Sequence, residues 1–352
     1  MKKIFLIGIA ATAILASCSN DETVEMSSAK TKAISFTNAF VNNGTRSIVD
    51  PSLTKETLGS FAVYGFTQNG QIFDGTVITS VDDGNTWNYT PLQYWVKGNQ
   101  YAFGAIAPAN ITVTGEKLLG QSVADYKVGM TVSFSNDGKT DLLHAAPEKG
   151  YDATAEFMAS PETVNMTFNH QLSKVKFSFE NAVGEVYNIK VTNIKITDAK
   201  TEGTLTIAED GNTWTAQNGS DELIFGNAVA EGAESEEAVK IANGSEGESY
   251  NEILMIPTGT DATYTVTFTA ELLNGEVTMG TYNHTATISN VELKLGYCYD
   301  FKATLTPENI VVDPENPDVQ LKPIKFDVVK VEGWNEDNNS QELPIPDNQS
   351  GN

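Results

Sequence analysis

Apolar and polar residues alternate along most of this 352-residue chain after residue 33. Runs such as 175–179 (VKFSF), 187–191 (YNIKV) and 264–269 (YTVTFT) place an apolar side chain at every second position. This period, with many β-branched and aromatic residues, is typical of strands that bury one face. Clusters of Gly, Asn and Asp separate the runs and suit tight hairpin turns. The pattern therefore predicts an all-β chain of antiparallel β-sandwich type.

Helical spacing is scarce, and its best short candidates are Asp141–Ala146 and Glu116–Asp125. A five-residue motif, Asp-Gly-Asn-Thr-Trp, occurs at 83–87 and again at 210–214. This repeat is explained either by duplication of a domain or by convergence on the same hairpin turn. Both explanations place a Trp-bearing hairpin in each half of the chain, which favours two domains.

The first residues have the pattern of an export signal. Lys2 and Lys3 precede a 13-residue apolar run, 4–16, which is shorter than the roughly 20 residues that a membrane span needs. Residues 15–18 (LASC) resemble the lipobox of bacterial lipoproteins, so we expect removal of residues 1–17 and acylation of Cys18, for example with palmitate. The alternative is an ordinary signal peptide with an incidental Cys. The acidic residues of 19–22 (SNDE) resemble a surface-export signal, or else form a plain polar tether.

The amino-acid composition limits the kinds of functional site that the chain can form. Two Cys and three His are too few for a multi-ligand Cys/His metal site or a disulfide scaffold. The net charge of −24, without clustered Lys and Arg, excludes a generic nucleic-acid binder. His144, His170 and His284 lie in separate segments, and no nucleophile, phosphate-loop or metalloprotease motif is present. We therefore expect no enzyme activity, no metal and no cofactor, and a core position for Cys298.

The predicted organisation has five parts. Residues 1–17 are the signal peptide, and 18–46 are a tether with a first strand. Two β-sandwich domains follow at 47–162 and 163–334, divided at the polar, Pro-bearing break 160–162. Residues 335–352 form a polar tail.

Three stretches in order carry a family resemblance: 87–95 with 101–108, 141–146 with 168–175, and 296–301 leading to 324–334. Together with the lipobox, they resemble the fimbrillin family of Bacteroidetes, whose members are subunits of lipoprotein-derived type V pili. The resemblance implies two tandem transthyretin-like β-sandwich domains. It also implies that an Arg-specific protease removes the first strand and that subunits then polymerise by strand exchange.

The sequence has parts that fit this route. Arg46 is the single Arg of the chain and lies in the polar segment 42–47, so cleavage between Arg46 and Ser47 is expected. A surface Arg without a special role is the alternative. Ile34, Phe36 and Phe40 would share one face of the removable strand.

The candidate donor strand is 323–331, in which Ile324, Phe326 and Val328 alternate with polar residues. It is equally well an ordinary last strand of the second sandwich. Several Pro residues in 307–323 would keep the segment before it extended.

The resemblance thus predicts a fimbrial subunit of the outer membrane and cell surface that serves cell adhesion. Its expected partners are other fimbrial subunits in a homopolymer, the processing protease and the lipid anchor. Two alternatives stay open: an anchor or tip subunit that keeps its first strand, and a glycan-binding surface lipoprotein. In the second alternative Trp87, Tyr89, Tyr94 and Trp95 would form an exposed sugar platform, whereas core packing is the competing interpretation of these aromatic residues.

Overall fold

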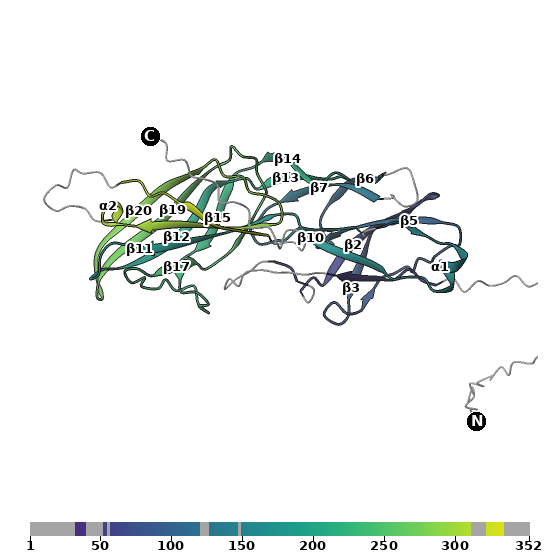
Figure 1. Cartoon of the computed structure of the whole chain (residues 1–352), viewed down its shortest axis with the longest axis horizontal. Coiled ribbons are helices and arrows are strands. Elements are labelled where there is room, and N and C mark those ends of the chain that lie inside the picture. Colours follow the sequence, from purple (N-terminus) through teal and green to yellow (C-terminus); the bar gives the residue numbers. More distant parts are fainter. Residues whose placement is uncertain are drawn as a thin grey trace, which may run out of the picture. The chain divides into compact units, whose positions relative to one another are not determined.

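The computed structural model describes residues 32–39, 52–54, 57–119, 127–146, 149–310 and 322–333. All of them belong to one unit, Lys32–Asn352. The described part is built almost entirely of β-strands (Figure 1), which confirms the all-β prediction. Its helices are the short α1 (Ala155–Ala159) and α2 (Pro307–Ile310).

The largest sheet has eight strands. They are β1 (Phe36–Ala39), β2 (Ser60–Thr67), β3 (Gly70–Ser80), β4 (Trp87–Asn88), β5 (Gln100–Ala107), β8 (Leu143–Ala145), β9 (Tyr151–Asp152) and β10 (Val164–His170). Their order is β1-β10-β8-β5-β2-β3-β4, with β9 paired to β5. β1 is an edge strand and runs parallel to β10, whereas the other pairs in this sheet are antiparallel.

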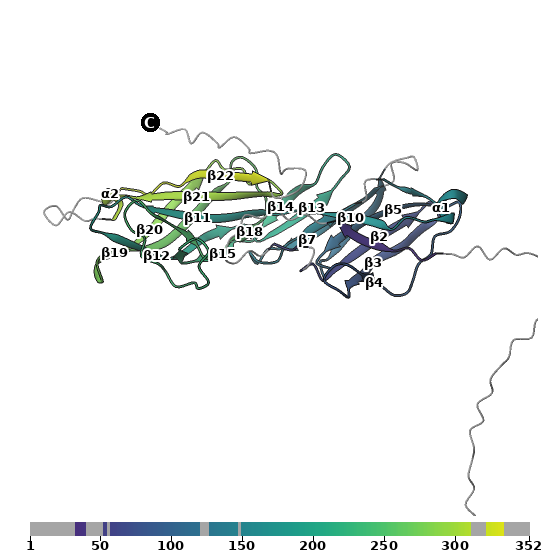
Figure 2. The same ribbon diagram turned by 60° about the horizontal axis from the view of Figure 1, so that its bottom comes forward.

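A four-stranded sheet packs against the largest one. It contains β6 (Val113–Leu119), β7 (Lys127–Ser135), β13 (Glu202–Ile207) and β14 (Thr213–Asn218), in the order β14-β13-β7-β6 (Figure 1). Figure 2 shows β13, β14 and β7 of this sheet from a second direction. Buried Tyr64 and Ile106 of the first sheet share a core cluster with Val132 and Leu205 of this one, so the two sheets form a sandwich. The sheet takes two strands from each side of residue 162; the division into domains there stays a prediction.

Two further sheets form a second sandwich. One contains β11 (Ser173–Asn181), β16 (Ala228–Val229), β17 (Glu246–Ser249), β18 (Ile253–Met255), β21 (Tyr297–Leu305) and β22 (Asp327–Gly333). The other contains β12 (Asn188–Ala199), β15 (Asp221–Gly226), β19 (Thr263–Asn274) and β20 (Val277–Ser289). Phe177, Ile196, Val266 and Phe301 belong to the cluster between them, which we call the second core. β11 and β21 are parallel, a second exception to the predicted antiparallel pairing.

The largest sheet is buried on both faces. In β2, Phe61 and Val63 belong to a cluster that also holds Trp95 and Phe103, which we call the first core. Ala62 of the same strand faces the sandwich side. This double burial explains why the sequences of β2 and β5 are almost continuously apolar.

Both candidate helices were wrong where the structure describes them. Residues 143–145 form β8, because this short segment pairs with both β5 and β10. Residues 116–119 belong to β6, and the rest of that candidate, 120–125, lies outside the described residues. A short apolar run fits either a helix or a strand, so tertiary pairing decides its form. The two copies of Asp-Gly-Asn-Thr-Trp do lie at the β3–β4 and β13–β14 turns.

Candidate functional site

Residues 32–39, which we call the β1 segment, are bound on two sides by different parts of the chain. On one side β1 pairs with β10 from Phe36↔Val164 to Ala39↔Thr167. On the other side, the Ile34 backbone N–H donates to the Gln93 carbonyl oxygen at 2.9 Å. β1 itself is the edge of its sheet, whereas the residues just before it are also held by the backbone of 93–95.

Two side chains of the β1 segment fill the first core. Ile34 is 1% exposed and Phe36 is 5% exposed. The Phe36 ring lies edge-on to Phe73, Tyr89 and Phe103, with ring centroids 5.4, 5.8 and 5.7 Å away. Burying each of these two side chains is worth roughly 1.5–3 kcal/mol. Departure of the segment would therefore open an apolar groove lined by aromatic rings.

The structure does not describe the remaining residues that are predicted to take part in processing. Cys18, Phe40, Arg46 and Ser47 lie outside the described residues, as do the signal peptide 1–17 and the tail 335–352.

The candidate donor residues lie in the other sandwich. Ile324, Phe326 and Val328 are buried in the second core. The Phe326 ring lies 5.2 Å from Phe177 and 5.8 Å from Phe179 between centroids. β22 itself is an edge strand that pairs with β21. The structure thus places Ile34 and Phe36 of the predicted removable strand in one core and the candidate donor residues in the other.

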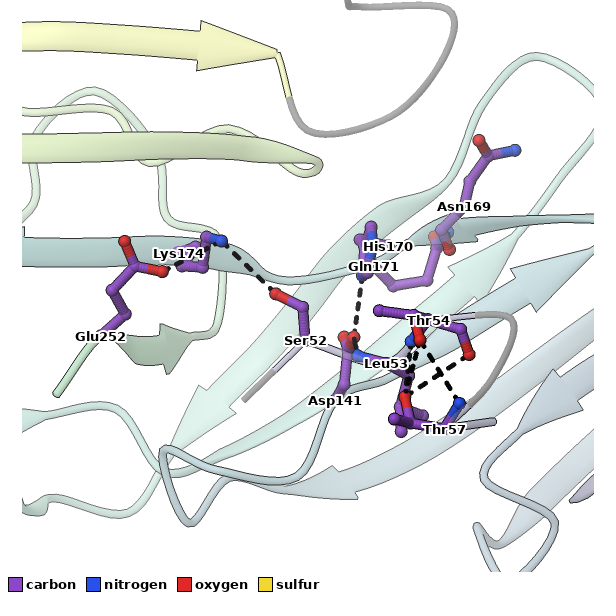
Figure 3. Close-up of polar contacts among 10 residues, drawn as sticks. All are labelled: Ser52, Leu53, Thr54, Thr57, Asp141, Asn169, His170, Gln171, Lys174 and Glu252. Atoms are coloured by element: carbon purple, nitrogen blue, oxygen red, sulfur yellow. Dashed lines mark hydrogen bonds and ion pairs between the residues drawn. The ribbon is translucent and has the colours of Figure 1, made fainter. Parts of the chain in front are cut away.

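A buried carboxylate holds the chain just after the predicted cleavage segment. Asp141 is 2% exposed, and its Oδ2 accepts a hydrogen bond from the Leu53 backbone N–H at 2.9 Å. The same oxygen lies 2.8 Å from Nδ1 of His170, which is 1% exposed (Figure 3). The Asp141 carboxylate therefore contacts both the ring of His170 and the backbone of the segment after the predicted cleavage site.

A buried ion pair lies beside the same segment. Lys174 Nζ is 3.0 Å from Glu252 Oε2, and the two side chains are 1% and 3% exposed. Lys174 Nζ also donates to Ser52 Oγ at 3.4 Å (Figure 3). We call Ser52, Leu53, Asp141, His170, Lys174 and Glu252 the polar clasp. Because removing charges from water is costly, each charge of the clasp depends on its partners.

The turn that follows the clasp in the sequence is also held by hydrogen bonds. Thr54 and Thr57 exchange hydrogen bonds, among them Thr54 N–H to Thr57 Oγ1 at 2.8 Å. Leu58 then enters the first core at 4% exposure. Polar contacts with Asp141 and Lys174 and the burial of Leu58 thus attach residues 52–54 and 57–58 to the rest of the chain. Residues 55 and 56 lie outside the described part.

No local pattern in the sequence indicates the clasp. Lys174 stands in the alternating run 173–179, where a lysine indicates a solvent-facing position. Its burial results from the approach of Ser52 and Glu252, which are distant in the sequence.

The aromatic residues that could have formed a sugar platform are mainly core residues. Trp87 is 8% exposed and Trp95 is 0% exposed. The Tyr89 hydroxyl donates to the Ile34 carbonyl oxygen at 2.7 Å, so it supports the β1 segment. Tyr94 is the exposed member at 45%. Core packing is therefore the interpretation that the structure favours for these residues.

The described ranges hold no metal-binding cluster. They contain no group of three or more His, Cys, Asp or Glu side chains placed to hold a metal ion. Nor does any helix in that part of the chain have the length and apolar character needed to cross a membrane. Cys298 is half-buried at the margin of the sandwich cluster.

His144 predicts an acid-sensitive stability. Burial lowers its pKa from 6.5 to about 4. Between these values the unfolded chain binds the proton and the folded chain does not, so stability falls as the pH drops from 6.5 towards 4. His144→Gln should reduce the loss of unfolding free energy between pH 7 and pH 5 by about 2 kcal/mol. Urea unfolding at both pH values measures this, and an unchanged loss in the variant would contradict it.

Known proteins share both the sequence pattern and the fold. A family model described as fimbrillin-like matches residues 19–318. A fimbrial protein from Bacteroides vulgatus ATCC 8482 is 16% identical, with 86% of this chain and 99% of that chain covered and a TM-score of 0.54. Candidate cell adhesion proteins from Bacteroides uniformis ATCC 8492 and Bacteroides ovatus ATCC 8483 are 14% and 13% identical, with TM-scores of 0.47 and 0.45. Each of these two covers 86% of this chain over 98% of its own. At these identities the solved structures bear on the fold alone.

Among curated protein sequences, none matches this chain.

Proposed function

This chain belongs to the fimbrillin-like family, and from that premise we propose that it is a surface fimbrial subunit that polymerises by strand exchange. The observation that carries the proposal is the β1 segment. It is an edge strand with two buried apolar anchors, Ile34 and Phe36, and the chain is next described at the polar clasp, where it is fixed again. A cut after Arg46 would fall between these two attachments, so the strand could leave while the subunit stays folded.

Strand loss would create a defined binding site. The groove would be lined by Phe73, Tyr89 and Phe103, and the β10 edge would lose its backbone partner. An extended strand from a neighbouring subunit would restore both the hydrogen bonds and the apolar contacts by β-augmentation. The groove requires a donor with apolar side chains at alternate positions.

The segment 323–331, in which Ile324, Phe326 and Val328 alternate with other residues, meets this requirement. Donation requires that it leave the second core, where its side chains are buried. If 323–331 is instead an ordinary last strand, it stays in the second core of its own subunit. A different extended segment would then be the donor. Lipidation of Cys18 would hold the precursor at the outer membrane before the protease acts. A subunit that keeps β1 and its lipid would instead act as an anchor.

The decisive experiment concerns Arg46. We expect the chain carrying Arg46→Ala to lose the ladder of polymers seen on unboiled gels after treatment with an Arg-specific protease, because β1 then stays covalently attached. Lys55→Ala is the control, since it removes a nearby positive charge and leaves the cut intact. N-terminal sequencing of the cut wild-type chain should begin at Ser47. A ladder that persists in Arg46→Ala would refute the proposed route, and a wild-type chain that is never cut would favour the anchor role.

A further inference from the structure

The strand β20 is a long edge that lacks the usual protection. It is the outer strand of the order β15-β12-β19-β20, and it pairs with β19 alone among the described residues. Its 13 residues, VTMGTYNHTATIS, include no Lys, Arg, Asp, Glu or Pro. Edge strands normally carry such residues because exposed backbone N–H and C=O groups bind other strands.

Other long edges of the described sheets are protected differently. β15 begins with Asp221 and Glu222, and β22 carries Asp327, Lys330 and Glu332. β6 contains charged residues at 116 and 117, whereas the uncharged edge β14 has only 6 residues. The absence of charge from a strand as long as β20 is therefore specific to this edge.

The geometry of β20 suits an extended partner. Its register shift lies near the hairpin, between Leu272↔Gly280 and Leu273↔Thr278. From Gly280 to Ser289 the ladder with β19 is regular, so the outer edge there is a continuous row of backbone groups. Val277 and Met279 at the hairpin end are 63% and 55% exposed.

We propose that β20 pairs antiparallel with β20 of a second copy of this chain, about a two-fold axis at Asn283. In this register Gly280 faces Ala286, Thr281 faces Thr285 and Tyr282 faces His284, each pair occurring twice. Inward-facing residues meet inward-facing ones, because the register preserves the two-residue period. An isologous contact of this kind closes after two copies.

The lack of charge on β20 favours a second copy over a basic foreign peptide. The chain as a whole is strongly acidic and would attract basic partners, but β20 offers no carboxylate to recognise them. Within 280–286, the part of β20 that pairs regularly in the proposed register, neither copy has a charged residue, so no like charges meet across the axis. The net charge of −24 still repels the approaching copy, and pairing should therefore strengthen with salt.

The pairing of two single copies does not depend on the proposed function. In a fimbrium, however, each subunit would present one such edge, and many weak contacts would add up along two neighbouring polymers. Lateral bundling of fimbriae is the consequence that rests on the proposed polymer.

The test uses the full chain with Cys18→Ser, so that no lipid is attached. Sedimentation equilibrium at about 0.3 M NaCl should show a monomer–dimer equilibrium that weakens at low salt. Asn283→Lys and Asn283→Asp each place like charges on the axis and should lower the association constant about tenfold. An equimolar mixture of the two variants should associate again, because the introduced ammonium of one copy then faces the introduced carboxylate of the other. Ile224→Lys adds a positive charge at the opposite edge and should have no effect.

Three results would overturn the inference. The first is a wild-type chain that stays monomeric at high salt. The second is an association that Asn283→Lys leaves unchanged or that Ile224→Lys removes. The third is a mixture that associates no better than its components. Circular dichroism of each variant confirms folding, and the recovery in the mixture shows that both variants are competent. Loss of the polymer ladder in Arg46→Ala bears on the proposed function and leaves this equilibrium untouched.

Discussion

Replacing Lys174 by methionine is expected to lower the free energy of unfolding by roughly 3–5 kcal/mol. The side chain is 1% exposed, and its loss leaves the Glu252 carboxylate, 3% exposed, without the ammonium 3.0 Å away. A buried charge without its partner is far more destabilising than the loss of an apolar contact of similar size. Chemical unfolding of the wild-type and variant chains measures the difference.

The matched control for this effect is the double variant Lys174→Met with Glu252→Leu. It removes both charges and retains volume, so most of the lost stability should return. A second control is Lys195→Met, whose Nζ lies 2.7 Å from Glu222 Oε1 but whose side chain is 33% exposed. It should cost no more than about 1 kcal/mol. Equal losses in Lys174→Met and Lys195→Met would show that burial of the pair has no energetic role.

The Lys174 variant also tests the attachment of the segment after the cut. Hydrogen exchange at Leu53, whose N–H is bonded to Asp141, should quicken in Lys174→Met, because Ser52 loses its contact with the ammonium. The increase at Leu53 should exceed any change in β20, because that strand contains no residue of the clasp. If the hydrogen exchange of Leu53 is unchanged, Lys174 stabilises the ion pair with Glu252 but does not hold the segment after the cut.

Replacing Phe36 by alanine is expected to lower the free energy of unfolding of the uncut chain by roughly 3–5 kcal/mol. Its ring contacts three aromatic rings of the first core and is 5% exposed, so truncation leaves a cavity. The proposed function adds a sharper expectation. After the cut at Arg46 and departure of β1, wild-type and Phe36→Ala chains should have the same stability, because residue 36 is no longer present.

Phe326→Ala provides the comparison for this prediction. Phe326 packs in the second core against Phe177 and Phe179, and its loss should destabilise the chain before and after the cut alike. Unfolding curves of wild type and the two variants, each before and after the cut, separate the cases. A stability difference between Phe36→Ala and wild type that survives the cut would mean that the first strand does not leave.

The alternation of the sequence was enough to predict the strands and, for the β1 segment, to place Ile34 and Phe36 on one buried face. It did not predict the direction of β1, because alternation is the same in parallel and antiparallel strands. The partner of β1 is β10, which begins at Val164, and no local pattern in the sequence identifies a neighbour so distant in the chain. Pairing of this kind is decided by the whole fold.

The clasp was beyond prediction for a related reason. Asp141 and Lys174 are residue types that normally face water, and each is buried because distant segments supply its partners. The Leu53 N–H that binds Asp141 is 88 residues away in the sequence. The burial of the aromatic residues was easier to predict from the sequence, since large rings in alternating segments usually pack inside the protein. Trp87 and Trp95 follow that rule.

The ladder between β7 and β13 has a consequence for how the subunit responds to force. β7 comes from the N-terminal half and β13 from the C-terminal half, and they pair from Glu202↔Ser135 to Ile207↔Met130. Two domains on a simple linker would swing freely under tension. Here the halves can be pulled apart only after this ladder and the apolar cluster beneath it rupture. The join therefore transmits tension from one half to the other, as the proposed role of a fimbrial subunit would require.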